Sequence, residues 1–348
     1  MGSRRTVEIK GLTIGGNSPV RVESMLKTPL SDAEGCAAEC DDLRKAGCEL
    51  IRVSFPDLSL APSLAKLNDL SSVPLMADIH FNHKLAIAAL ESGCASIRIN
   101  PGNMNDKKGL KDLVTLAGSL GAVIRIGANG GSISSKQLDR AAGDRAAALA
   151  YAVEEQLSLL ADNSFDNVII SAKSSSVTET VRANTLLARK YPFPVHIGIT
   201  EAGSGNAGIV KGASGISLML AQGIGDTVRV SLTGPSPEEV RTAYSILGAL
   251  EIRQRGYNII SCPTCGRKRI DVLKLVEEVV SLLPDDAADG TTVAVMGCEV
   301  NGPREAASAD LGIAGTPDGF VMFRRGRHVC NDTLNNLKKR LLEELERS

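Results

Sequence analysis

The stretch Leu50-Ile51-Arg52-Val53-Ser54 decides which fold to expect, because its pattern returns three more times along the chain. One arginine stands between β-branched residues in Ile97-Arg98-Ile99-Asn100, in Ile124-Arg125-Ile126-Gly127 and in Val228-Arg229-Val230-Ser231. Short runs that are apolar almost throughout are typical of parallel strands whose two faces are both covered. The repeats therefore predict a parallel sheet in which each of four strands contains one arginine.

Eight runs of this kind alternate with helical patterns. They are Val20–Ser24, Leu50–Ser54, Pro74–His80, Ser96–Asn100, Ala122–Gly127, Asn167–Ser171, Pro194–Thr200 and Thr227–Leu232. Eight strand–helix units over roughly 250 residues are the size and count of a (β/α)8 TIM barrel. A doubly wound open sheet is the alternative. It is less well supported, because no Gly-x-Gly-x-x-Gly follows the first strand.

A second, small α+β domain is expected after the polar stretch Glu251–Gly256. We place the domains at residues 1–252, a substrate-binding barrel, and 253–348. In the smaller domain the patterns predict strands at Asn258–Ile260, Thr292–Met296 and Phe320–Arg324, and helices at Asp271–Leu283 and Asp332–Glu346.

Composition narrows the possible functions. The net charge of the 348 residues is −1, aromatic residues make up 3%, and tryptophan is absent. Neither a general attraction to nucleic acid nor a platform for stacking bases is expected. No apolar run approaches the length of a membrane span. Eight cysteines in a chain of this length do not form a dense disulfide framework. We therefore expect a cytoplasmic protein with reduced thiols that binds neither nucleic acid nor membrane.

The ends of the barrel strands carry the polar residues expected of a ligand site. Arginines that converge on one barrel mouth would form a clamp for phosphate or diphosphate. The alternative is structural ion pairing inside the barrel. The candidate binding residues are Arg52, Asp78, His80, Arg98, Asn100, Arg125, Asn129, Lys173, Arg229 and Ser231. Glu201 is the candidate general acid or base, whereas His196 is interpreted as a core histidine.

Three cysteines in the small domain have the pattern of a metal site. Cys262-Pro263-Thr264-Cys265 is a Cys-x-x-Cys turn, and Cys298 follows a predicted strand. Three thiolates leave a fourth position open on a metal or cluster. The spacing does not separate zinc from an iron–sulfur cluster, and Cys330 and Glu305 are the candidates for the fourth ligand. The remaining four cysteines, Cys36, Cys40, Cys48 and Cys94, are expected in the barrel core.

The motifs together resemble one family, 4-hydroxy-3-methylbut-2-enyl diphosphate synthase of the methylerythritol phosphate route to isoprenoids. The matching stretches are Ala77–Phe81, Ile97–Asn103, Ile124–Ser132, Gly198–Gly203, Cys262–Cys265 and Gly297–Ala306. They occur in the family's order across nearly the whole chain. No long insertion separates barrel and small domain, so the chain resembles the compact bacterial type.

The resemblance implies a TIM barrel followed by a domain like half of a sulfite/nitrite reductase. It implies a [4Fe–4S] cluster held by Cys262, Cys265, Cys298 and Glu305. The substrate would be 2-C-methyl-D-erythritol 2,4-cyclodiphosphate, with Glu201 handling a proton. Its diphosphate would be held at Arg52, Arg98, Arg125, Lys173 and Arg229. Flavodoxin or ferredoxin would supply electrons, and the enzyme would work as a head-to-tail homodimer.

The chain departs from the family pattern at several positions. Glu23 stands where glutamine is usual, and Lys27 where asparagine is usual. Ser204-Gly205-Asn206 replaces a Gly-Ala-Arg loop, and Arg304 replaces a glycine. These changes concern substrate fit and loop closure.

A second hypothesis belongs to another class of protein. The barrel motifs without the thiols would suit a phosphate-ligand-binding protein or a transferase like a pterin synthase, with a zinc-stapled domain for protein contact.

Overall fold

The computed structural model describes residues 3–80, 82–100, 106–283, 289–298, 304 and 306–346. The chain divides between Arg253 and Gln254 into two compact units. One sheet of eight strands organises the first unit, and one sheet of five strands organises the second.

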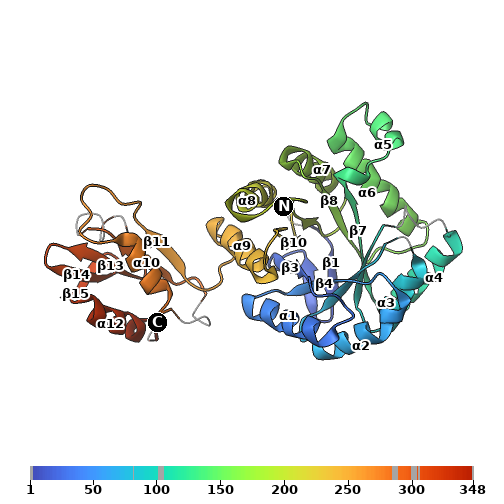
Figure 1. Cartoon of the computed structure of the whole chain (residues 1–348). Coiled ribbons are helices and arrows are strands. Elements are labelled where there is room, and N and C mark those ends of the chain that lie inside the picture. The colour runs from blue at the N-terminus through green and yellow to red at the C-terminus, as the bar shows by residue number, and fades with distance from the viewer. Residues whose placement is uncertain are drawn as a thin grey trace. The chain divides into compact units, whose positions relative to one another are not determined.

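The first unit is a TIM barrel, as predicted (Figure 1). Its strands are β3 (Arg21–Met25), β4 (Leu50–Ser54), β5 (Leu75–Asp78), β6 (Ser96–Ile99), β7 (Val123–Asn129), β8 (Val168–Lys173), β9 (His196–Ile197) and β10 (Thr227–Val228). The sheet order is β8-β7-β6-β5-β4-β3-β10-β9 with parallel neighbours. A parallel bridge between Ile170 and Val195 closes the ring.

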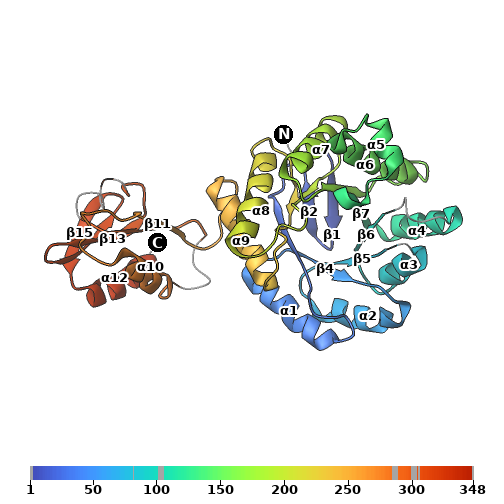
Figure 2. The same cartoon turned by 45° about the horizontal axis from the view of Figure 1, so that its top comes forward.

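Helices surround the strands (Figure 2). They are α1 (Ala33–Ala46), α2 (Ala61–Leu70), α3 (His83–Glu91), α4 (Lys107–Leu120), α6 (Arg145–Ala161), α7 (Val177–Lys190), α8 (Gly205–Leu220) and α9 (Ser236–Ala249), with the shorter η1 (Leu58–Leu60), η3 (Gly130–Ser132) and α5 (Ser135–Arg140) between them. Carboxylates of Asp32, Asp106 and Asp144 accept hydrogen bonds from the first amides of α1, α4 and α6. These caps satisfy amides that have no partner inside the helix.

A hairpin of β1 (Thr6–Ile9) and β2 (Leu12–Gly15) closes one end of the barrel. Ile9 and Ile14 are fully buried, and they pack with Leu50, Val123 and Ile169 near the beginnings of barrel strands. The hairpin therefore plugs the amino-terminal end and leaves the carboxyl ends of the strands as the place for a ligand.

The second unit is a mixed sheet in the order β11-β12-β13-β14-β15. Its elements are β11 (Asn258–Ser261), α10 (Val272–Val280), β12 (Thr292–Met296), β13 (Leu311–Thr316), β14 (Gly319–Arg324), β15 (Arg327–Asp332) and α12 (Leu334–Glu346). Strands β11, β12 and β13 are parallel, whereas β14 and β15 run antiparallel to their neighbours. The carboxyl ends of β11 and β12 therefore lie at the same edge.

The sequence patterns missed β13 and β15. Glycines at positions 312 and 315 weaken the strand pattern of β13. Packing requires a glycine at position 312, because a Cβ there would lie 2.2 Å from the Phe323 ring on the neighbouring strand. Across the described part of the chain, no helix combines the length and apolar character needed to cross a membrane.

Candidate active site at the barrel mouth and cysteine site in the second unit

Strands β4, β5 and β6 bring two arginines to one aspartate. Arg52 Nε lies 3.5 Å from Asp78 Oδ2, and Arg98 Nη1 lies 3.4 Å from Asp78 Oδ1. Burial raises the pKa of the Asp78 carboxyl, but the two guanidiniums outweigh burial and hold that pKa below its usual value. The two guanidiniums thus share one carboxylate. Because neither has a counter-charge of its own, both can bind a further anion.

Arg125 lies deeper in the barrel than the other arginines, with 1% of its surface exposed. Its Nη1 donates to Glu23 Oε2 from β3, and Glu23 is equally buried. His196 Nδ1 lies 3.6 Å from the same carboxylate and 2.7 Å from Thr227 Oγ1. Glu23 Oε1, Arg125 Nη2 and His196 Nε2 are buried without a hydrogen-bond partner among the described residues.

Arg229 follows β10 and pairs with Glu239 of α9, with 3.2 Å between Nε and Oε2. Glu239 also accepts a hydrogen bond from the Ser24 hydroxyl at 3.0 Å and lies 3.4 Å from Lys27 Nζ. A Cβ at Gly198 would lie 2.5 Å from the Arg229 carbonyl oxygen. The missing side chain at Gly198 therefore lets the strand carrying Arg229 approach its neighbour.

Lys173 ends β8 and is nearly buried. Burial lowers the pKa of its ammonium well below the usual value, and Arg125 and Arg52 lower it further. Among the described residues, the Glu23, Asp78 and Glu239 carboxylates each pair with at least one arginine of this mouth. An anion arriving near Lys173 would favour the charged form of the lysine.

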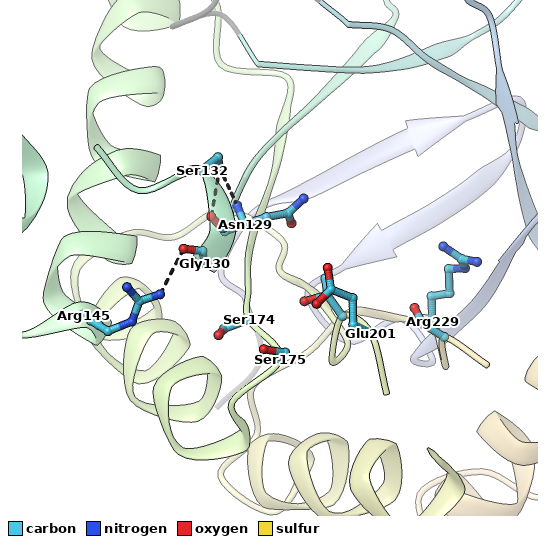
Figure 3. A pocket seen from close by; sticks show the side chains of 11 residues that line it. Asn129, Gly130, Ser132, Arg145, Ser174, Ser175, Glu201 and Arg229 are labelled. Carbon is cyan, nitrogen blue, oxygen red and sulfur yellow. Dashed lines mark hydrogen bonds between the residues drawn. The ribbon is translucent and has the colours of Figure 1, made fainter. Parts of the chain in front are cut away.

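A cavity of about 610 Å³ opens at the same end of the barrel (Figure 3). Its lining includes Asn129, Glu201, Arg229 and Ser231. The Glu201 side chain lies between Asn129 and Arg229 in Figure 3. Glu201 has a φ of 52°, in the left-handed region that a residue with a Cβ rarely adopts. Backbone strain of this kind is concentrated at functional sites.

In the second unit, the strand pairing brings Cys262 beside the Cys298 loop. Ser261 pairs with Val295 across β11 and β12, and the Gly297 amide donates to Cys262 Sγ at 3.2 Å. Thr264 has a φ of 64°, which turns the chain sharply between Cys262 and Cys265. Thiols at the ends of adjacent parallel strands are the donors that an iron–sulfur cluster requires, so the residues present fit such a group.

Within the described residues no three metal-binding side chains converge closely enough to hold a metal ion. The predicted ligand Glu305 lies outside the described residues.

The proposal of Cys330 as a fourth ligand was wrong. Cys330 lies on β15, and two strands, β13 and β14, separate β15 from β12. Each spacing between neighbouring strands is ~4.8 Å, so the three spacings between β12 and β15 add up to roughly 14 Å, which is too far for a metal shared with thiolates at the ends of β11 and β12.

Comparison with known proteins agrees with this architecture. The family model described as the GcpE TIM-barrel domain matches residues 4–244, and the GcpE protein C-terminal domain matches residues 258–347. The chain belongs to the GcpE family. Members of this family resemble it over nearly its whole length.

Two relatives are named 4-hydroxy-3-methylbut-2-en-1-yl diphosphate synthase (flavodoxin). The protein from Lawsonia intracellularis is 42% identical over 325 residues, 93% of this chain and 90% of its own length. The protein from Natranaerobius thermophilus is 43% identical over 342 residues, 98% of this chain and 94% of its own length.

Two solved structures resemble this chain in the fold of its barrel. Dihydropteroate synthase from Xanthomonas albilineans has a TM-score of 0.50 at 13% identity, covering 70% of this chain and 98% of its own. For 3-dehydroquinate dehydratase from Geobacillus kaustophilus the TM-score is 0.50 at 14% identity, with coverage of 72% and 99%.

Most of the polar residues predicted for this GcpE family member lie around the mouth. Arg52, Asp78 and Arg98 form one network, and Asn129, Glu201, Arg229 and Ser231 line the cavity. His80 is exposed, with its Nε2 4.0 Å from Asp78 Oδ2, and Asn100 is half-buried and has a polar partner.

The sequence patterns do not identify Glu23 and Glu239 as buried partners of the arginines. Glu23 is a departure from the family pattern, and only the tertiary structure shows that it pairs with Arg125. Glu239 follows Ser236-Pro237 in the first turn of α9, where an acidic residue has an ordinary explanation as a helix-end charge.

Proposed function

We propose that this chain is the flavodoxin- or ferredoxin-dependent iron–sulfur oxidoreductase that opens 2-C-methyl-D-erythritol 2,4-cyclodiphosphate. Written for neutral acids, the substrate takes two electrons and two protons, one ring C–O bond and one C–OH bond break, and 4-hydroxy-3-methylbut-2-enyl diphosphate and water form. The observation that carries the proposal is the barrel mouth, where carboxylates hold Arg52, Arg98 and Arg229, and where Arg229 and Glu201 line one cavity.

The cationic residues would bind the diphosphate. Arg52 and Arg98 are held by a shared aspartate, and Arg229 is held by Glu239, so their guanidiniums are oriented before an anion arrives. Such preorganisation lowers the entropic cost of binding. Lys173 would add a charge-assisted hydrogen bond as the anion raises its pKa. Asn129 and Ser231 line the cavity together with Arg229 and would hydrogen-bond the substrate's oxygens.

Glu201 would handle the proton that leaves with water. It lies in the cavity across from Arg229, on a strained loop that follows β9. A carboxyl group that faces the departing oxygen can donate a proton to it, which turns hydroxide into the better leaving group, water.

Cys262, Cys265, Cys298 and Glu305 would hold a [4Fe–4S] cluster. When bound, the cluster would pass electrons to the substrate one at a time. The proposal includes a head-to-tail homodimer, in which the second unit of one protomer serves the barrel of its partner, and a location in the reducing cytoplasm.

The experiment that tests this function starts from anaerobically purified full-length protein. We expect about four iron and four acid-labile sulfide per chain, a brown colour, and conversion of the cyclic diphosphate when dithionite or reduced flavodoxin is supplied. Bound zinc in a colourless protein that lacks iron and sulfide even after reconstitution would favour the transferase hypothesis instead.

A further inference from the structure

The cysteine edge of the second unit carries an exposed basic run that the proposed chemistry does not use. Arg267, Lys268 and Arg269 follow Cys265 after one glycine, and all three residues are exposed, as is Cys265 itself. Between Ser261 and Ile270 the sequence contains no aspartate or glutamate. Arg304, which follows β12 in the sequence, is exposed as well.

These cations differ from the basic residues at the other end of the same sheet. There Arg324 pairs with Glu344 and Arg325 pairs with Asp310, each at 3.1 Å. By contrast, the described residues place no carboxylate within ion-pair distance of Arg267 or Lys268. The nearest acidic residue in sequence, Asp271, accepts a hydrogen bond from the Lys274 amide as the cap of α10. Among the described residues, Arg267 and Lys268 therefore have no carboxylate beside them that would neutralise their charge.

An apolar surface adjoins the basic run. Leu273, in the first turn of α10, is 69% exposed, and Val280 is 48% exposed seven residues later, on the same face of the helix. Exposed large apolar side chains next to a charged group are a frequent feature of protein interaction sites. A short basic run beside a few exposed apolar side chains is suited to a brief encounter rather than to a permanent interface.

We propose that Arg267, Lys268 and Leu273 form the docking surface for a small acidic one-electron carrier of the flavodoxin class. This inference rests on the proposed function, which requires electrons from outside to reach the thiolate site. The exposed Cys265 lies within three residues of both cations, so a carrier bound here has its redox group close to that site. Opposite charges steer such encounters and make them fast at low salt. Two reduced carriers, each oxidised by one electron, serve one turnover.

The test compares two double variants with the same change in net charge. Arg267→Glu with Lys268→Glu reverses the proposed surface. Arg327→Glu with Lys339→Glu reverses two exposed cations elsewhere in the same unit. Binding of oxidised flavodoxin is followed by its amide chemical shifts. Turnover is measured over a salt series with reduced flavodoxin, and separately with dithionite.

We expect the first variant to bind flavodoxin at least about tenfold more weakly at low salt and to lose its salt dependence. Its iron content and dithionite-driven turnover should stay within about twofold of the parent protein. The second variant should behave as the parent does. Unchanged flavodoxin binding by the first variant, or an equal loss in the second, would overturn the docking surface. Failure of the parent protein to turn over with dithionite would instead count against the proposed function.

Discussion

At the scale of single residues, Glu23 changes the expectation for Arg125. The sequence placed Arg125 among four equivalent arginines at the mouth. The structure pairs it with Glu23, and both side chains are buried. Arg125 therefore shows the structural ion pairing that was the alternative for all four arginines, while its Nη2 has no partner among the described residues and stays a candidate for the ligand. Breaking such a buried pair is costly because the remaining charge has no solvent to stabilise it.

Glu23→Gln tests this pair. We expect the free energy of unfolding to fall by about 3 kcal/mol at neutral pH, because Arg125 loses its counter-charge. Burial raises the pKa of Glu23, but Arg125 and Arg52 outweigh burial and hold it below the ordinary 4.5. A carboxylate with a lowered pKa stabilises the fold above its ordinary pKa, and this contribution disappears as the pH falls through the lowered value. The difference between parent and variant should therefore shrink in acid.

The same variant should bind the cyclic diphosphate more tightly. Removing a negative charge from an anion site frees Arg125 for the ligand, and we expect roughly tenfold higher affinity, or about 1.4 kcal/mol. Asp166→Asn, at the exposed pair with Arg5, is the matched control and should change neither quantity by more than about 1 kcal/mol. Equal affinity in the parent and Glu23→Gln would mean that Arg125 does not reach the ligand.

At the scale of elements, the β1–β2 hairpin explains why one end of the barrel is closed. Alternation in Thr6–Ile9 puts Val7 and Ile9 inside and leaves Thr6 and Glu8 exposed. The inward face packs against residues near the beginnings of barrel strands.

Ile9→Ala should therefore destabilise the first unit. Truncating a fully buried isoleucine costs about 2–5 kcal/mol, from lost apolar contact and the cavity left behind. Glu8→Ala, on the outer face of the same strand, should stay within about 0.5 kcal/mol. Denaturant unfolding followed by circular dichroism measures both changes, and similar values for the two variants would contradict the role of the plug.

A further prediction concerns Glu305, the proposed fourth cluster ligand, which follows β12 in the sequence. In an anaerobically loaded protein, Glu305→Ala should leave three thiolates and an iron that air removes faster. We expect at least about tenfold lower turnover and faster bleaching of the visible absorption on exposure to air. Glu343→Ala, at an exposed position of α12, is the control. Full activity with parent-like bleaching would exclude Glu305 as a ligand.

At the scale of the whole molecule, the two units divide the proposed work. The barrel collects the charges that would bind the substrate, and the second unit places Cys262 beside the Cys298 loop. Neither unit by itself contains both groups of residues. Electrons would therefore take two steps. The proposed docking surface would bring them from the carrier to the cysteine site, and the proposed homodimer would bring that site to a barrel.

The sequence by itself determined the barrel, the second α+β unit and most of the polar residues at the mouth. Apolar periodicity and strand-end positions are local properties, and parallel strands in a barrel necessarily bring their carboxyl ends together. Only the tertiary structure decided which charges pair. Glu23 lies 102 residues from Arg125 in sequence, and Ser24 lies 215 residues from Glu239. No local pattern encodes such contacts, since they depend on how eight strands close into a ring and on which side chains that closure removes from water.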